Sequence, residues 1–544
     1  MKIRTNKMGW KNKRRYNKLK RCYYGVKGCG IKGFISYMKD KPRIQDNSAY
    51  MEWRTRFKLD LNELERQKNE EFVQKPLISI LVPVYNTKPD FFEDMIESVR
   101  KQTYGNWELC IANASPSNKV LSEILEKKND SRIKVIDVVN NEGIAQNTNA
   151  ALEIATGDYI GLLDHDDTLA ENALFEIVKL VNQKNVDVIY TDEDKMSWDG
   201  KEYFEPHFKS DMNQDLLYSN NYICHFFVVK RKIAKEIGGF REKYNGAQDY
   251  DFILRCTNRT KKVEHIAKPL YHWRSHKDST AENPESKQYA YEAGKRAIED
   301  LLQENGKEAI VEDTENPGFY HVKYKLKNND KVLIIVIYQD RDNEKRQIKK
   351  CIRSIKKTAG YSNYEIVFMQ KNSKIVPTEL KAKYLMFIDS TIEVISKGWL
   401  YEMLAIIQQE YVGAVGTKIY KRNETIYHAG IILGKDTYAF ENQPRWEYAE
   451  FHRDSLMQDM SAVSSDMMIM SREDFLGITD GDLQKLNDEG EIGKKIYAKG
   501  KKVVYNPNIE AYTTKNKSCL IKSGDVDMYY ESLKKYLSEL RYCV

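Results

Sequence analysis

The segment GDYIGLLDHDD, residues 157–167, places a short apolar run directly before three carboxylates. The run YIGLL predicts a buried strand, because it is uninterrupted and bounded by polar residues. Asp164, Asp166 and Asp167 follow it, and like charges so closely spaced cost stability unless a cation lies between them. Carboxylates with no thiolate nearby suit a hard cation such as Mg²⁺ or Mn²⁺. The segment therefore predicts a metal site at a strand end; the alternative is a solvated turn in which Asp167 caps the next helix.

Strands and helices alternate around this segment. In order, the predicted elements are residues 77–86 (strand), 91–102 (helix), 107–112 (strand), 133–138 (strand) and 147–155 (helix). This alternation predicts an α/β fold with a mostly parallel sheet and helices on both faces. Such sheets bind ligands at the carboxyl ends of their strands. Residues 83–86, residues 113–115 and the acidic cluster all lie at predicted strand ends, so we expect them to meet in one crevice.

The distribution of charge excludes one class of partner. The chain has 544 residues, enough for two or three domains, and a net charge of +7. Residues 1–43 hold fifteen Lys and Arg against one acid, so the remainder of the chain is net acidic. A nucleic-acid-binding protein would carry basic stripes on the fold itself, and we therefore expect no nucleic-acid partner. The eight cysteines are scattered without a CxxC pair, which indicates a reducing, cytoplasmic setting.

Residues 1–47 are a basic arm that also carries aromatic side chains. One interpretation is a peripheral contact with the inner face of the cell membrane, with the aromatic rings at the headgroup level. The alternative is a disordered basic tail. Glycines at positions 25, 28, 30 and 33 argue against a continuous helix. Residues 48–75 are predicted to be a helical connector, and no apolar run approaches the ~18 residues needed to cross a bilayer.

Residues 76–310 resemble the inverting family 2 glycosyltransferases, which have the Rossmann-like GT-A fold. The motifs that carry the resemblance occur in the family's order: PVYN at 83–86, NEGIA at 141–145 with Asn149, GDY at 157–159, DHDD at 164–167, YTDED at 190–194, GGF at 238–240, QDYD at 248–251 and YHWRSH at 271–276. The segment looks particularly similar to the rhamnosyltransferase-like bacterial enzymes that build cell-surface polysaccharides such as capsule, cell wall and O-antigen. The resemblance implies a nucleotide-sugar donor and a glycan acceptor.

The resemblance also implies a divalent metal, Mn²⁺ or Mg²⁺. It would be held by Asp166 with Asp164 or Asp167 beside it, where it would stabilise the charge that develops on the nucleotide leaving group. In similar enzymes a histidine after the catalytic carboxylate completes the metal shell. His276 is the first choice for that ligand and His272 the second, although a lone histidine is more often structural.

Asp249 is the general base that the resemblance implies. A carboxylate close to the acceptor hydroxyl can take its proton while the sugar is attacked from the face opposite the nucleotide. From the residues alone, Asp249 and Asp251 could equally be acids that stabilise the N-terminus of a helix.

Eight positions are predicted to contact the nucleotide-sugar: Pro83, Tyr85, Asn86, Asn113, Asn149, Asp164, Asp192 and Asp194. The family commonly has an Asp at the position of Asn113, where it accepts a hydrogen bond from the nucleotide base. The amide oxygen of Asn113 can still accept that bond, but without charge the bond is weaker. For Asp192 and Asp194, a polar strand end is the competing interpretation.

Residues 330–514 repeat the start of the first domain. The segment AKYLMFID, residues 382–389, echoes residues 157–164, and the acidic cluster is reduced to Asp389-Ser390-Thr391. In residues 486–490, Gly490 stands where an acid is expected. We therefore predict a second, degenerate GT-A-like domain without catalysis, a scaffold or glycan platform, followed by a C-terminal helix in residues 515–544.

The function that the resemblance implies is hexosyl or deoxyhexosyl transfer, with inversion, to a growing cell-surface polysaccharide, which we expect to be lipid-linked. Two alternatives stay open: a non-catalytic glycan-binding or assembly protein with two degenerate domains, and a bifunctional transferase with both domains active. A nucleotidyltransferase is disfavoured, because it would need a glycine-rich, basic phosphate loop near the first strand, and PVYN is not one.

Overall fold

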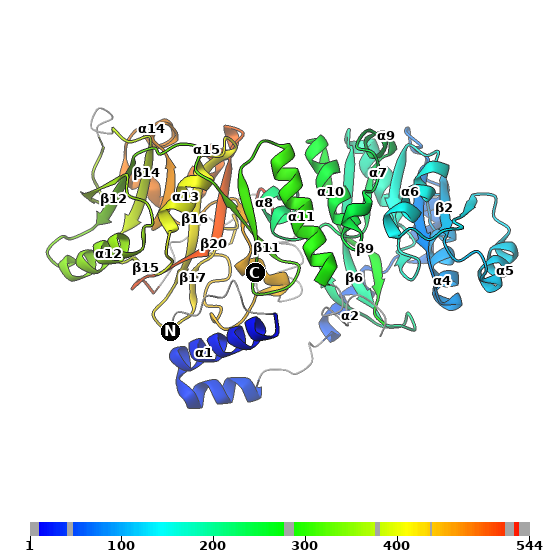
Figure 1. The fold of residues 1–544 in the computed structure, drawn as a ribbon, viewed down its shortest axis with the longest axis horizontal. Coiled ribbons are helices and arrows are strands. Elements are labelled where there is room, and N and C mark those ends of the chain that lie inside the picture. The colour runs from blue at the N-terminus through cyan, green and yellow to red at the C-terminus, as the bar shows by residue number, and fades with distance from the viewer. Residues whose placement is uncertain are drawn as a thin grey trace.

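The computed structural model describes residues 10–40, 47–276, 288–375, 381–435, 438–516 and 527–531. Two sheets with their helices lie side by side along the long axis, joined by α11 (Gln288–Glu304) and the hairpin of β10 (Ala309–Asp313) and β11 (Tyr320–Tyr324) (Figure 1). The predicted α/β class is confirmed. The helix predicted for residues 515–544 falls mostly outside the described ranges.

The first sheet has the strand order β3-β2-β1-β4-β8-β6-β9-β5, with β7 paired to β6. Its strands are β1 (Ile78–Val84), β2 (Trp107–Asn113), β3 (Ile133–Asp137), β4 (Tyr159–Leu162), β5 (Thr168–Leu169), β6 (Val188–Met196), β7 (Tyr203–His207), β8 (Phe227–Lys230) and β9 (Val263–Arg274). The first four run parallel, as predicted. β8 runs antiparallel to both β4 and β6, so the sheet as a whole is mixed rather than mostly parallel.

Helices cover both faces of this sheet. They are α4 (Pro89–Arg100), α5 (Lys119–Lys128), α6 (Ile144–Ile154), α7 (Ala173–Gln183), α8 (Gln214–Ser219), α9 (Arg231–Glu236) and α10 (Gln248–Arg259). β1 and β2 are apolar along almost their whole length because each is buried on both faces. One apolar core lies under α4 and α7. The other, under α6 and α10, continues through α11 and β11 into the second domain, so the two domains share a core.

The second sheet has the order β13-β12-β14-β19-β16-β20-β15, with β17 paired to β16 and β18 to β20. Its strands are β12 (Val332–Tyr338), β13 (Tyr364–Gln370), β14 (Tyr384–Asp389), β15 (Glu393–Val394), β16 (Val412–Tyr420), β17 (Ile426–His428), β18 (Gln458–Met460), β19 (Met467–Ser471) and β20 (Lys502–Tyr512). Its helices are α12 (Lys345–Thr358), α13 (Trp399–Ile407), α14 (Arg472–Thr479) and α15 (Glu489–Ala498). The strand order repeats that of the first sheet without an equivalent of β3.

The strand register aligns the two sheets residue by residue. β1 pairs Ile78 with Tyr159 on β4, and β12 pairs Val332 with Tyr384 on β14, so Asp389 is the counterpart of Asp164. The first domain has β3 and α6 between β2 and β4, whereas the described residues between β13 and β14 contain no helix or strand of comparable length. The repeat inferred from the sequence is therefore present in the fold, together with its internal deletion.

The basic arm forms helix α1 (Trp10–Asp40), which lies beneath the second domain (Figure 1). We expected its glycines to interrupt a helix, and this expectation was wrong except at Gly30, where a positive φ of 74° breaks the helix into two halves. Gly28 instead permits close docking, because a Cβ there would lie 2.6 Å from the Trp446 ring. Gly25 packs against Phe34 across the break, where a Cβ would lie 2.1 Å from that ring. No helix in the described ranges is long and apolar enough to cross a membrane.

Two further helices follow α1. Helix α2 (Ser48–Phe57) packs on β7. Helix α3 (Leu61–Lys68) is capped by Asp60, whose side chain accepts a hydrogen bond from Glu63 N at 2.7 Å. The predicted helical connector is thus two short helices.

Candidate active site

The acidic cluster lies at the carboxyl end of β4, but its three carboxylates have different surroundings. Asp167 is 1% exposed, and it accepts hydrogen bonds from Tyr271 OH at 2.6 Å and from Arg274 N at 2.7 Å. Burial, with the charges of Asp166 and Asp164, raises the pKa of Asp167 well above its usual range. Both of its oxygens are used within the protein, which connects the β4 end to β9. Asp164 and Asp166 remain half-buried, so these two carboxylates are available to a metal.

His276 is adjacent to Asp166. Its Nε2 lies 2.9 Å from Asp166 Oδ2, and its ring packs on Phe91 with centroids 5.3 Å apart. The buried Nδ1 of His276 has no hydrogen-bond partner among the described residues, so this side of the imidazole is not held by them. Two carboxylates and an imidazole suit Mn²⁺ or Mg²⁺ when donor phosphates supply further oxygen ligands. In the described part of the chain, no three His, Cys, Asp or Glu side chains are arranged to hold a metal by themselves.

His272, the second choice as metal ligand, lies in a separate buried network. Its Nδ1 is 2.5 Å from Asp194 Oδ1, and Asp194 Oδ2 accepts from Tyr50 OH and Arg54 Nη1, each at 2.5 Å. Tyr50 and Arg54 come from α2, which sequence reasoning treated only as a connector. Asp194 is 1% exposed, so this network ties α2 to the strand that the sequence predicted would contact the donor.

Asp192 is also engaged by the protein. Its Oδ1 accepts from Lys209 N at 2.8 Å and lies 2.9 Å from His265 Nε2, and the residue is fully buried. Burial lowers the pKa of His265, but the charges and hydrogen bonds of Asp192 and Asp211 together outweigh burial and raise that pKa to about 8. Asp192 and Asp194 lie inside β6 rather than at its end, and both are buried and hydrogen-bonded within the protein.

Asp249 and Asp251 stand in the first turn of α10 and have opposite surroundings. Asp251 forms ion pairs with Arg241 and, at 2.7 Å, with Arg255. Within the described ranges Asp249 forms no ion pair, and its side chain accepts a hydrogen bond from Asn221 Nδ2 at 3.1 Å. Burial raises the pKa of Asp249; His225 opposes this rise and the Asp164 charge adds to it. The interaction with Asp164 brings α10 and the end of β4 into one electrostatic site.

The predicted nucleotide end lies on β1 and β2. Tyr85 is 51% exposed, and Asn86 has a φ of 48° and donates its N–H to Ser115 Oγ at 3.0 Å. The register pairs Pro83 with Ala112 on β2. The loops after the two strands are thus hydrogen-bonded to each other at the carboxyl edge of the sheet.

Asn149 of α6 lies apart from these loops. Its side-chain amide donates to Phe240 O and accepts from Phe240 N, both at 2.8 Å. It therefore fixes the turn of the GGF motif through the backbone.

Asp137, which sequence reasoning did not select, lies beside Asn113. Asn113 Nδ2 donates to Asp137 Oδ1 at 2.9 Å, and Asn113 Oδ1 accepts from Ser115 N at 3.1 Å. Asn113 is buried, whereas Asp137 is exposed at the carboxyl end of β3. The signal that could have found it is its position, because Asp137 ends a strand parallel to β2 and in register with Asn113.

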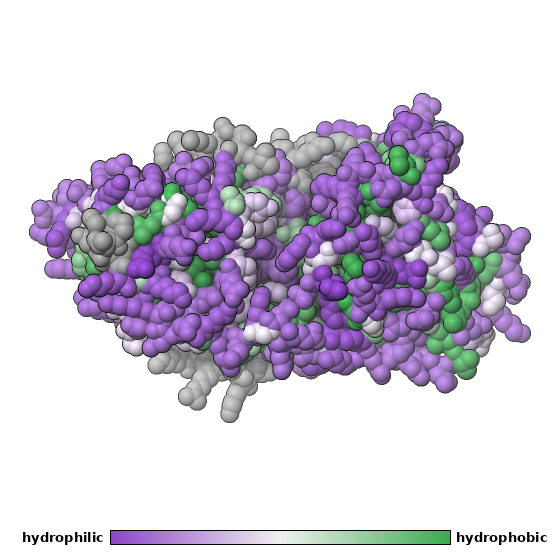
Figure 2. All heavy atoms as spheres, turned by 90° about the horizontal axis from the view of Figure 1, so that it is seen from above, coloured by the Kyte–Doolittle hydropathy of each residue, from purple (hydrophilic) through white to green (hydrophobic). Residues whose placement is uncertain are grey.

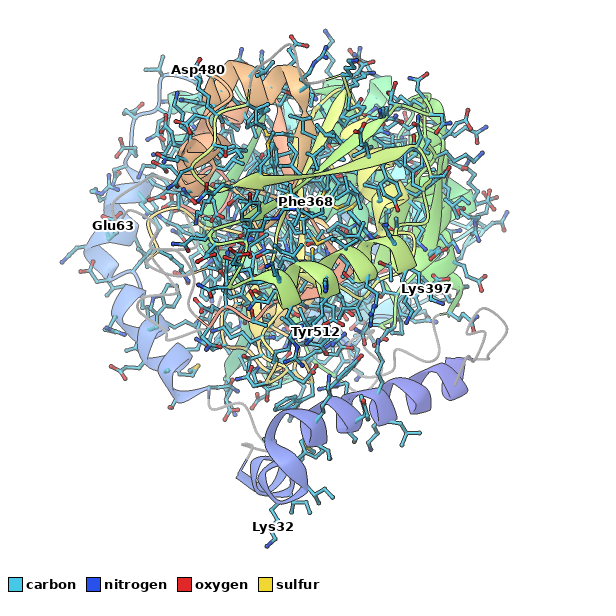
Figure 3. The ribbon with its side chains drawn as sticks, turned by 90° about the vertical axis from the view of Figure 1, so that its left-hand side faces the viewer. Lys32, Glu63, Phe368, Lys397, Asp480 and Tyr512 are labelled. Carbon is cyan, nitrogen blue, oxygen red and sulfur yellow. The ribbon has the colours of Figure 1, made fainter. Side chains whose placement is uncertain are left out.

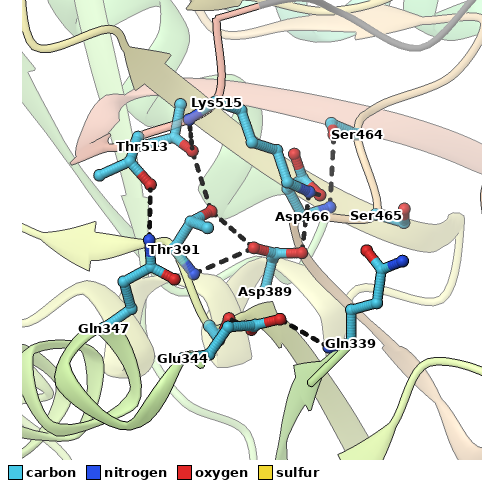
Figure 4. Close-up of polar contacts among 12 residues, drawn as sticks. Gln339, Glu344, Gln347, Asp389, Thr391, Ser464, Ser465, Asp466, Thr513 and Lys515 are labelled. Atoms are coloured by element: carbon cyan, nitrogen blue, oxygen red, sulfur yellow. Dashed lines mark hydrogen bonds and ion pairs between the residues drawn. The ribbon is translucent and has the colours of Figure 1, made fainter. Parts of the chain in front are cut away.

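At the corresponding edge of the second sheet, a lysine side chain contacts two carboxylates (Figure 4). Lys515 Nζ lies 2.8 Å from Asp389 Oδ2 and 2.6 Å from Asp466 Oδ1. Thr391, which replaces an acid, donates to Asp389 Oδ1 through its backbone N–H at 3.0 Å. Glu489 at the start of α15 accepts from Tyr438 OH at 2.8 Å, and burial, with the Asp466 charge, raises its pKa to about 7. The Lys515 ammonium group thus neutralises Asp389 and Asp466.

The fold and this site define a GT-A domain of the glycosyltransferase class. Residues 79–238 match the family Glycosyl transferase family 2. Residues 79–238 are therefore a family 2 glycosyltransferase domain, and the predicted GT-A domain followed by a second domain is confirmed.

Curated relatives extend over both domains. "Uncharacterized protein y4gI" of Sinorhizobium fredii is 34% identical over 483 residues, which is 80% of this chain and 53% of that protein. "O-antigen biosynthesis protein RfbC" of Myxococcus xanthus is 30% identical over 474 residues, 79% of this chain and 37% of its own length. The chain thus spans about half the length of the first relative and less of the second. Among solved structures, S. aureus TarS in complex with UDP-GlcNAc is 18% identical, with a TM-score of 0.35 over 41% of this chain and 66% of that one.

Proposed function

We propose that the first domain is a metal-dependent, inverting glycosyltransferase that moves a hexosyl or deoxyhexosyl group from a nucleotide-sugar to a growing cell-surface polysaccharide. The observation that carries this proposal is the pairing of two kinds of carboxylate at one sheet edge. All three are half-buried: Asp249 forms no ion pair within the described ranges, whereas Asp164 and Asp166 lie beside His276. A proton acceptor and a cation-binding group within electrostatic reach of each other suit displacement of a nucleoside diphosphate by a hydroxyl.

Asp164, Asp166 and His276 would hold the metal, and Asp167 would keep their loop in place through Tyr271 and Arg274. When bound, Mn²⁺ or Mg²⁺ neutralises charge on the departing diphosphate. The hydrogen bond between His276 and Asp166 aligns these two side chains beforehand, so little rearrangement is needed for both to bind one ion.

Asp249 would orient the acceptor and take its proton. Its hydrogen bond from Asn221 leaves carboxylate lone pairs for the acceptor hydroxyl. Proton transfer to Asp249 strengthens the nucleophile on the side of the sugar opposite the nucleotide, which gives inversion. Because burial raises the pKa of Asp249, proton acceptance is more favourable than at an exposed Asp, and the rate should rise as pH increases through that pKa.

We also propose that the acceptor is a lipid-linked glycan and that the protein works at the inner face of the cell membrane. The second domain would serve as a scaffold or glycan platform, since Lys515 neutralises its remaining carboxylates and Thr391 replaces one acid. This assignment disfavours the bifunctional alternative.

The test of the proposed function is a panel of UDP-, dTDP- and GDP-sugars incubated with the full chain. We expect slow hydrolysis of one donor class with Mn²⁺ or Mg²⁺ and none with EDTA, and faster turnover once an acceptor glycan is supplied. Absence of turnover with every donor and metal, with or without extracted lipid-linked glycans, would favour the non-catalytic assembly protein instead.

Asp137 is expected to supply the charge that Asn113 lacks in reading the nucleotide base. We predict that Asp137→Asn raises KM for the donor about 3- to 10-fold with kcat little changed, because a hydrogen bond to a charged acceptor is stronger than one to a neutral amide. Steady-state kinetics with the donor identified by the panel would measure this. Asp130→Asn, at the opposite end of β3 where Asp130 pairs with Arg132, is the matched control and should leave KM unchanged. Equal KM values in wild type and Asp137→Asn would exclude the assignment.

A further inference from the structure

Helix α1 shows different chemistry on its two sides. One side docks on the second domain and on the β10–β11 hairpin. Arg21 Nε donates to Trp446 O at 2.7 Å, and the Arg445 guanidinium lies 3.9 Å from the centre of the Tyr24 ring. Lys20 pairs with Glu315 of the hairpin at 3.2 Å. These contacts involve buried or half-buried groups, so the helix is fixed to the body rather than trailing from it.

The other side exposes large apolar residues at helical spacing. Before the break at Gly30 they are Leu19, Tyr23 and Val26, which are 64%, 62% and 37% exposed. After the break they are Ile31, Ile35 and Met38, which are 65%, 50% and 56% exposed. Both triplets follow the i, i+4, i+7 pattern, so each half of α1 carries one narrow apolar stripe. By contrast, the face of the molecule opposite α1 is mostly hydrophilic (Figure 2).

Two helices at this end of the molecule expose basic residues. Lys18 and Lys32 are exposed on α1, and Lys32 points away from the body (Figure 3). Helix α12, at the same end of the molecule as α1 (Figures 1 and 3), buries Ile348, Cys351 and Ile355. It exposes seven cations on its other side: Lys345, Arg346, Lys349, Lys350, Arg353, Lys356 and Lys357. An apolar stripe beside positive charge complements the acyl boundary and headgroups of an anionic lipid bilayer.

We infer that α1 is an in-plane membrane anchor whose apolar stripes enter the headgroup region of an anionic bilayer, and that the basic side of α12 adds electrostatic attraction. Because α1 is docked on the second domain, the anchor fixes the height and orientation of the body over the lipid surface. The inference rests on the proposed function only in that a lipid-linked acceptor would be presented there. It also gives the second domain a role that needs no catalysis.

The test is co-sedimentation of the full chain with vesicles of phosphatidylglycerol and phosphatidylcholine. Ile31→Ser, Ile35→Ser and Met38→Ser together should lower the apparent affinity at least tenfold without changing net charge. The matched control replaces Val73, Val139 and Trp198, which are 97%, 85% and 67% exposed elsewhere, by Ser and should leave affinity unchanged. Equal loss in both triple variants, or no loss in the α1 variant, would overturn the inference.

A second arm separates charge from apolar insertion. Changing Lys349, Arg353 and Lys356 to Gln should weaken binding several-fold at low salt and have less effect at high salt, since screening removes the same attraction. An unchanged affinity at low salt would exclude α12 from the surface. If the α1 variant instead converts a dimer to a monomer and still binds vesicles, the stripe is a subunit interface. Donor hydrolysis without vesicles should be normal in every variant, so failure of the anchor is distinguishable from failure of the transferase.

Discussion

Replacing Asp249 by Asn is expected to lower kcat for sugar transfer about 10²- to 10⁴-fold, the range that a general base contributes. The amide is nearly isosteric but cannot accept the proton of the acceptor hydroxyl. Donor affinity should change little, because Asp249 lies at the start of α10 rather than at the β1 and β2 loops. The measurement is transfer kinetics with the donor identified by the panel, together with thermal unfolding. Wild-type rates in Asp249→Asn would refute the role of Asp249.

The stability of this variant carries independent information. Burial raises the pKa of Asp249 above its value in the unfolded chain, so ionisation of Asp249 disfavours the folded state as pH rises through that pKa. An uncharged Asn removes this cost, and Asp249→Asn should unfold at the same temperature as wild type or higher. Asp251→Asn is the contrasting control. It breaks buried ion pairs with Arg241 and Arg255 and should cost about 3 kcal/mol of stability.

Replacing Asp166 by Asn is expected to lower metal-dependent transfer about 10²- to 10³-fold, the usual effect of removing one group that stabilises leaving-group charge. The concentration of Mn²⁺ needed for half-maximal rate should rise as well, since His276 loses its charged neighbour. A metal titration of the rate measures both effects. An unchanged metal requirement would show that Asp166 is not a ligand.

Asp389→Asn is the matched control in the second domain. Asp389 is the register counterpart of Asp164, but it contacts the Lys515 ammonium. If the second domain lacks catalysis, transfer in this variant should equal that of wild type. Conversely, a variant that combines Asp166→Asn with Asp249→Asn should retain no transfer; residual transfer would mean that the second domain is active.

Much of the fold follows from local sequence. An apolar run such as β1 is stable only where both faces of the strand are buried. Because such strands alternate with amphipathic helices, the sequence implies a layered α/β domain. The repeat could be read because strand-forming segments such as residues 382–389 kept the hydrophobic pattern after their acids were lost. The antiparallel direction of β8 could not be read, because a short strand has the same pattern in either direction.

The candidate site, like the fold, could be predicted from the sequence only in part. From the residues alone, Asp164, Asp166 and Asp167 were predicted to lie at one sheet edge, because they follow a strand. Asp249 was added only by the resemblance to family 2 glycosyltransferases. Only the tertiary structure decided which carboxylates are engaged by the protein. Asp167 meets Tyr271 and Asp194 meets Arg54, each from a distant part of the chain, and Asp251 meets Arg241 from outside its own helix. A carboxylate's surroundings are set by long-range contacts, and in residues 157–167 these separate two adjacent acids: Asp166 faces His276, and Asp167 holds the loop in place.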